Sequence, residues 1–189
     1  MDILEIPASR LDDYARIPIS FEVRALLVVE LVQDGLGGML FHERRVAAYA
    51  KDYDVLDPPS GWPARFDLGK WGIFLAVEAG QVLGGVVLAW QTAGVDMLDG
   101  RDDLSLLWDI RVLPAQRRQG VGRGLFRHAV AWSRERHCTQ MKIETQNVNV
   151  DTCRFYAAQG ARLGDIRRFA YRGEATVKDE VQLNWYFDC

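Results

Sequence analysis

Several features that mark other classes of protein are scarce in these 189 residues. Only three cysteines and three histidines occur, without a CxxC pair or a close His and Cys set, so we expect neither a disulfide framework nor a metal site. No run of about eighteen apolar residues and no basic leader is present, so we expect a cytoplasmic chain that does not enter a membrane. The net charge of -3 gives no support for nucleic-acid binding.

One stretch reverses the mildly acidic balance of the chain. Residues 110–134 contain no Asp or Glu, whereas they contain six arginines. A local excess of positive charge indicates an anionic ligand at this place, although a basic and solvated start to a surface helix would also produce it. The six are Arg111, Arg117, Arg118, Arg123, Arg127 and Arg134.

This basic stretch contains a turn between a strand and a helix. Residues 104–112 read as a buried strand, and apolar residues recur at helical spacing from Val121 to Trp132. Gly120, Gly122 and Gly124 allow a ligand to approach the backbone closely. The unpaired N–H groups and the dipole of a helix N-terminus favour an anion there, so the turn is expected to hold phosphate.

Two familiar phosphate loops do not fit this turn. It has no lysine for a P-loop, and its glycine spacing does not give the third glycine of the dinucleotide motif. The remaining pattern, Arg117-x-x-Gly120-x-Gly122 after Val112-x-Pro114, resembles the pyrophosphate loop of the GNAT superfamily of acyl-CoA-dependent N-acyltransferases. The resemblance implies that acetyl-CoA is the co-substrate, with its pyrophosphate on the loop amides and its pantetheine along the preceding strand. The implied contacts are Ile110, Val112, Arg117, Arg118, Gln119, Gly120, Val121, Gly122 and Arg123.

A second motif follows at the separation seen in GNAT proteins. By resemblance, Asn149 would hydrogen-bond the coenzyme, and Tyr156 would lie near the sulfur and protonate the leaving thiolate. An ammonium group must lose a proton before it can attack a thioester, and Glu144, twelve residues before Tyr156, is the expected base. Asp109 is the rival base. An acyl-enzyme on Cys153 is less favoured, and no Gly-x-Ser-x-Gly elbow is present.

Each of these roles has a structural alternative. Glu144 could be a solvated carboxylate or the partner of Lys142 or of an arginine. Asp109 could cap a loop, and Tyr156 could be a core residue with its hydroxyl at the rim. The three roles are therefore hypotheses at this stage.

Three segments look like the streptothricin acetyltransferase branch of the superfamily: 108–112, 144–149 and 180–186. This resemblance implies acetylation of a primary amine on a polycationic antibiotic or a similar small molecule. Acetylation of a protein N-terminus or lysine, and a catalytically idle domain that only binds acyl-CoA, remain alternatives. A homodimer is the commonest expectation for a small enzyme.

The expected fold is a mixed α/β (α+β) sheet of the GNAT type in one domain, residues 1–189. It has antiparallel strands first, then a central β-α-β unit with a parallel pair, then C-terminal strands. Gly160-Ala161 stands where many GNAT proteins have Gly-Phe. The expected strands are 21–32 (also compatible with a buried helix), 39–46, a hairpin of 71–78 and 82–90, 104–112, 142–145, 162–171 and 180–187, with a long loop at 52–70 and helices from Gly120 and at 151–159.

Overall fold

The computed structural model describes all residues from Met1 to Cys189. Its residues cluster into two compact units. The first unit consists of residues 1–20, 52–143 and 186–189, and the second consists of residues 21–51 and 144–185.

The first unit is built on a sheet with the strand order β1-β4-β5-β6-β7. Neighbours from β1 to β6 run antiparallel, and β6 and β7 run parallel from Leu104 opposite Gln140 to Leu107 opposite Ile143. Helix α3 joins these two strands, which confirms the predicted β-α-β unit and its parallel pair. The strands are β1 (Asp2–Glu5), β4 (Gly72–Glu78), β5 (Gln81–Trp90), β6 (Leu104–Val112) and β7 (Gln140–Gln146), and α3 is Val121–Glu135.

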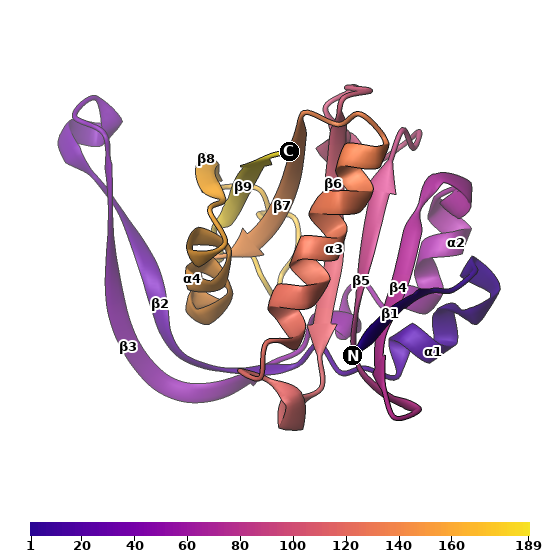
Figure 1. Cartoon of the computed structure of the whole chain (residues 1–189). Helices are drawn as coiled ribbons and strands as arrows, with labels where there is room; N and C mark the ends of the chain where they lie inside the picture. The colour runs from indigo at the N-terminus through magenta and orange to yellow at the C-terminus, as the bar shows by residue number, and fades with distance from the viewer. The chain divides into compact units, whose positions relative to one another are not determined.

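Helices cover both faces of this sheet. Successive Cβ positions of a strand point to opposite faces of the sheet. The surroundings of the neighbouring residues Gly84 and Gly85 of β5 therefore show what packs on each face. A Cβ at Gly84 would lie 3.3 Å from Leu125 of α3, and one at Gly85 would lie 2.7 Å from the Tyr14 ring of helix α1 (Leu11–Ala15). The two helices therefore pack on opposite faces, and Figure 1 shows α3 running along β5 and β6.

Residues 52–70 are not the long irregular loop that we predicted. They form three 3-10 turns, η3 (Tyr53–Val55), η4 (Pro59–Gly61) and η5 (Leu68–Lys70), and the short helix α2 (Trp62–Arg65). Pro59 is the first residue of η4 and Pro63 is the second residue of α2, and at both positions a missing N–H costs little. Trp62 is 1% exposed, and its ring centroid lies 6.1 Å from that of Trp71 and 6.0 Å from that of Trp108. The segment therefore adds an aromatic layer to the core.

The second unit contains a long hairpin, a helix and the end of the sheet. Strands β2 (Phe21–Leu31) and β3 (Met39–Lys51) pair antiparallel in one curved ribbon (Figure 1), so the strand reading of 21–32 is confirmed and its helical alternative is wrong. Strand β3 continues five residues past the predicted end at Val46. The sheet order continues β7-β9-β8. The remaining elements are α4 (Val150–Ala158), β8 (Arg162–Arg167) and β9 (Gln182–Asp188).

Several boundaries and two short elements differ from the expectation. Strand β8 ends at Arg167 rather than at Tyr171, because the chain turns from Arg168 onward. Strand β1 and helix α1 were not predicted, because they are too short to show a hydrophobic period. Four further 3-10 turns are η1 (Ala8–Arg10), η2 (Val32–Gly35), η6 (Asp96–Leu98) and η7 (Pro114–Gln116). None of the helices has the length and apolar character needed to cross a bilayer.

Candidate functional site

The second half of β6 does not pair with its parallel neighbour β7. The β6–β7 ladder ends at Leu107 and Ile143, whereas the pairing of β6 with β5 continues to Val112. The β5–β6 register shifts between the pairs of Leu107 and Asp109, which places a bulge at Trp108. Beyond this bulge β6 pairs only with β5, so part of its backbone N–H and C=O groups point away from β5. A ligand can form hydrogen bonds with these groups. Val112 and Ile110 lie in this stretch, as predicted for pantetheine contacts.

The turn after β6 exposes the amides of a helix start. Arg118 and Gly120 both have left-handed backbone conformations, with φ of 64° and 91°. Gly120 is the N-cap of α3, no side chain caps that end, and the first turn contains no acidic residue. A Cβ at Gly120 would meet nothing within 4 Å, so the space in front of the helix start is open. These features fit a bound pyrophosphate.

The arginines of the turn divide into two kinds. Arg117 donates from Nε to the Val112 carbonyl (3.1 Å) and from its guanidinium to the Ser20 carbonyl (2.9 Å). Arg117 therefore braces the loop against the strand before it. Arg118 and Arg123 are exposed and supply the positive charge at the helix start.

Arg111 of β6 is buried, with 2% of its surface exposed, whereas the arginines of the loop are exposed. It donates from Nε to Asp109 Oδ2 (2.7 Å), and its other two nitrogens donate to the two carboxylate oxygens of Asp54 at 2.8 and 2.7 Å. Burial raises the pKa of Asp109 to about 6, against the lowering effect of Arg111. Asp109 is thus a buried ion-pair partner and not the loop cap that we considered.

Helix α4 of the second unit carries the predicted Asn149 and Tyr156. Asn149 is the N-cap, since its side-chain oxygen accepts from the Thr152 amide at 3.3 Å. Tyr156 is 2% exposed, and its ring centroid lies 5.3 Å from that of Phe155. Burial raises the pKa of the Cys153 thiol, one turn earlier, and this disfavours the thiolate that an acyl-cysteine route needs.

Glu144 of β7 is held by uncharged donors. Its Oε1 accepts from the Tyr171 hydroxyl at 2.5 Å and from Gln146 at 3.2 Å, and its Oε2 accepts from Gln182 at 2.6 Å. It does not form the ion pair with Lys142 or an arginine that we considered, and Lys142 instead contacts Asp99. Tyr171 and Gln182 were not predicted as partners of Glu144, because they are distant from it in sequence; the only signal was that Gln182 lies in the branch-like segment 180–186.

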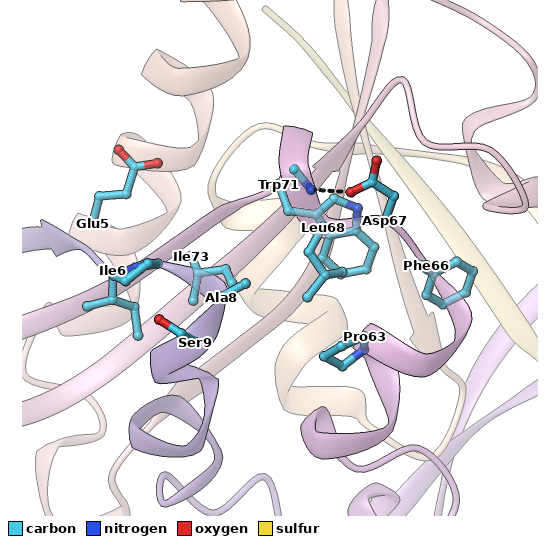
Figure 2. A pocket seen from close by; sticks show the side chains of 12 residues that line it. Glu5, Ile6, Ala8, Ser9, Pro63, Phe66, Asp67, Leu68, Trp71 and Ile73 are labelled. Carbon is cyan, nitrogen blue, oxygen red and sulfur yellow. Dashed lines mark hydrogen bonds between the residues drawn. The ribbon is translucent and has the colours of Figure 1, made fainter.

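A surface hollow of about 950 Å³ lies elsewhere in the first unit (Figure 2). Residues 5–9 line it together with seven residues between Pro63 and Ile73, which do not include Arg65 or Lys70. Its only charged side chains are those of Glu5 and Asp67, and Asp67 accepts from the Gly69 amide at 2.9 Å. A hollow with two carboxylates and no cation does not suit a pyrophosphate, so the α3 turn stays the predicted donor site.

Comparison with known proteins decides the family. The family model described as the acetyltransferase (GNAT) family matches residues 41–161. The chain belongs to the GNAT acetyltransferase family. This GNAT chain is 30% identical over 167 residues to the streptothricin acetyltransferase of Escherichia coli, across 88% of this chain and 84% of that relative. It is also 32% identical to streptothricin acetyltransferase A of Bacillus subtilis (strain 168), over 44% of this chain and 47% of the relative, so that match spans less than half of either protein.

A solved GNAT structure agrees over the whole length. It comes from Bacillus anthracis str. Ames, is provisionally assigned as a streptothricin acetyltransferase, and was determined in complex with acetyl coenzyme A. It has 26% sequence identity and a TM-score of 0.77, and the alignment covers 100% of this chain and 97% of that one. The chain is therefore an acetyl-CoA-dependent N-acetyltransferase, with the mixed α/β GNAT fold that we predicted.

Both GNAT motifs have the secondary structure that their roles require. The first motif runs from strand β6 through a turn into α3, and the second runs from β7 through a loop into α4. The context of each motif is thus confirmed. The individual roles of Glu144, Asp109 and Tyr156, and the coenzyme contacts, stay predictions.

Proposed function

We propose that this GNAT enzyme acetylates a primary amine of a streptothricin-like antibiotic. The observation that carries the proposal is the similarity to the Escherichia coli streptothricin acetyltransferase over 88% of this chain. The branch-like segments at 108–112, 144–149 and 180–186 support it. A small polycationic molecule is the expected acceptor.

The first unit supplies the groups that hold the donor. The amides from Arg118 to Arg123 bind the pyrophosphate, supported by the uncapped α3 start and the two left-handed residues in the turn. The pantetheine pairs with β6 near Val112, supported by the end of the β6–β7 ladder at Leu107. Arg117 acts indirectly, because it fixes the path of the loop through two backbone carbonyls.

The second unit supplies the proton-transfer groups. An alkylamine has a pKa of about 10.4, so a base must remove a proton before the nitrogen can attack the thioester carbonyl. Glu144 takes this proton before the C–N bond forms, and the nitrogen gives a second proton to water as the neutral amide forms. When the C–S bond breaks, Tyr156 gives its proton to the thiolate of coenzyme A and later regains one from water. Asn149 uses its amide N–H groups for the coenzyme, since its oxygen caps α4.

Asp109 is the weaker candidate for the base. Its carboxylate is buried and already bonded to Arg111, which also holds Asp54. A base must reach the acceptor nitrogen directly or through one water. The ion-pair network favours a structural role for Asp109, whereas Glu144 has only neutral partners.

We further infer a cytoplasmic location and propose a homodimer. All three cysteines are free, which suits a reducing compartment, and the cytoplasm is where the donor would be available. Cell fractionation tests the location, and light scattering of the purified chain tests the dimer. A secreted enzyme or a monomer would refute the corresponding inference.

A thiol-release assay with acetyl-CoA tests the proposed reaction. The panel contains streptothricin, aminoglycosides, polyamines and short peptides. We expect turnover that is fastest with streptothricin. Turnover with peptides alone would move the enzyme to protein acetylation, and coenzyme binding without turnover on any amine would indicate an acyl-CoA-binding domain.

A further inference from the structure

We propose that Tyr171 and Gln182 are positioning residues that orient the Glu144 carboxylate and reserve its Oε2 atom for the proton of the acceptor amine. This inference rests on the proposed function, because it assumes that Glu144 is the base. It concerns residues of the second unit only. Tyr171 lies in neither GNAT motif, and Gln182 lies in the branch-like segment 180–186, to which no individual role was assigned.

The hydrogen bonds to the Glu144 carboxylate leave one acceptor site free, and it lies on Oε2. A carboxylate has about four lone-pair sites, two on each oxygen. Tyr171 and Gln146 occupy both sites of Oε1, and Gln182 occupies one site of Oε2. The remaining site lies on Oε2, so an incoming N–H group, or one bridging water, is directed to that atom.

The three donors also form a connected network. Gln146 donates from the same nitrogen to Glu144 Oε1 and to the Tyr171 hydroxyl oxygen at 3.1 Å, while that hydroxyl donates to Glu144. Gln146 belongs to β7 itself, whereas Tyr171 and Gln182 come from the segment after β8. Two parts of the chain thus fix one rotamer of Glu144, which is the preorganisation that a base needs.

The charge of this network suits an ammonium group. All three donors are neutral. Gln146 and Gln182 carry no charge, and burial and the Glu144 charge raise the pKa of Tyr171 and keep it protonated. Glu144 forms no salt bridge, whereas the nearby Glu180 is paired with Lys51. The cluster therefore carries one uncompensated negative charge that an acceptor cation can neutralise.

The proton balance is simple. The acceptor R–NH₃⁺ gives one proton to Oε2 and becomes R–NH₂, whose lone pair forms the new C–N bond as the C–S bond breaks. The nitrogen gives its second proton to water as the neutral amide forms, and the thiolate of coenzyme A takes a proton from Tyr156, which water restores. Glu144 is then neutral and returns the proton to solvent after the product leaves. Tyr171 keeps its own proton throughout and acts only through Glu144.

A double-mutant cycle tests this inference. We expect Glu144→Gln to lower kcat by about 100-fold and Tyr171→Phe by about tenfold, with the KM for acetyl-CoA unchanged in both. Because Tyr171 acts through Glu144, adding Tyr171→Phe to Glu144→Gln should cause no further loss. Gln182→Met removes the donor to Oε2 and should also lower kcat, which provides a second test if Tyr171→Phe folds poorly. Tyr49→Phe, in β3 and 42% exposed, is the matched control.

The possible outcomes separate the inference from the proposed function. Full activity in both Tyr171→Phe and Gln182→Met, beside an inactive Glu144→Gln, would overturn the positioning roles and leave the base in place. A further loss when Tyr171→Phe is added to Glu144→Gln would also overturn them, since Tyr171 would then act independently. Full activity in Glu144→Gln would overturn the base assignment, and the inference with it.

Discussion

Arg111 and Asp109 form a buried ion pair two residues apart on β6, with Nε and Oδ2 separated by 2.7 Å. Two residues apart on a strand share one face, so the pair lies on the same side of the sheet. Asp54 takes the other edge of the guanidinium. The pair therefore ties η3 of the 52–70 segment to the strand that is predicted to hold the pantetheine.

The stability of the protein should depend on pH through Asp109. The pKa of this carboxyl is about 6 in the folded protein and about 3.9 in an unfolded chain. The folded state thus binds the proton more tightly, so the contribution of Asp109 to stability is full below about pH 4 and is lost as the pH rises through 6.

Asp109→Asn isolates this contribution. The difference in unfolding free energy between the native protein and the variant should fall by about 2 to 3 kcal/mol between pH 4 and pH 7, as measured by urea denaturation. Asp12→Asn, at an exposed position of α1, is the control. A difference that is flat over this range would contradict the raised pKa.

Gly122→Val should abolish the binding of coenzyme A while the protein stays folded. The branched side chain would stand in the first turn of α3, where the pyrophosphate is proposed to approach the backbone. Calorimetric titration with coenzyme A measures the loss, which we expect to exceed tenfold in Kd. Ala131→Val places the same side chain at an exposed position of the same helix and should bind normally. Equal affinities in the two variants would show that the turn does not hold the coenzyme.

Tyr156→Phe should lower kcat by tenfold or more. The change removes only the hydroxyl that is proposed to protonate the leaving thiolate, and the buried ring keeps its packing. Steady-state thiol release measures it, with circular dichroism as the check on folding. An unchanged kcat would remove Tyr156 as the acid.

Asn147 should contribute strongly to stability, because it bonds to two distant segments of the second unit. Its side-chain nitrogen donates to the Leu27 carbonyl at 2.9 Å, and its side-chain oxygen accepts from the Val181 amide at 2.8 Å. Its backbone forms two further bonds to the same residues. It is 6% exposed, so truncation leaves buried polar groups without partners.

We expect Asn147→Ala to lower the unfolding free energy by about 2 to 4 kcal/mol, since two buried hydrogen bonds are lost. Asn147→Asp keeps the acceptor for Val181 but places a carboxylate at the Leu27 carbonyl, and should also destabilise. Gln81→Ala, at an exposed strand position, serves as the control in chemical denaturation. A loss equal to that of the control would show that the bonds add nothing.

The elements around the donor site were predictable because they are long and carry clear signals. The spacing of Val121, Leu125, Ala129 and Trp132 marks α3, and all four are buried. The strand 104–112 agrees with β6 to the residue. The predicted helix 151–159 agrees with α4 to within one residue at each end, and Asn149 is its N-cap.

The partners of the site were not predictable, because they depend on tertiary contacts. Nothing in the sequence indicates that Asp54 meets Arg111 across 57 positions, or that Tyr171 reaches Glu144 across 27. The prolines of the 52–70 segment indicate a loop, because proline ends regular elements. They also begin short ones, and the burial of Trp62 stabilises those turns.

The most direct test of the central claim is the mass of streptothricin after incubation with the enzyme and acetyl-CoA, measured against a reaction with Glu144→Gln. The account predicts a single acetyl group on a primary amine of the antibiotic, released thiol in equal amount, and little product with the variant. Unmodified streptothricin in the presence of the folded, coenzyme-binding enzyme would contradict it.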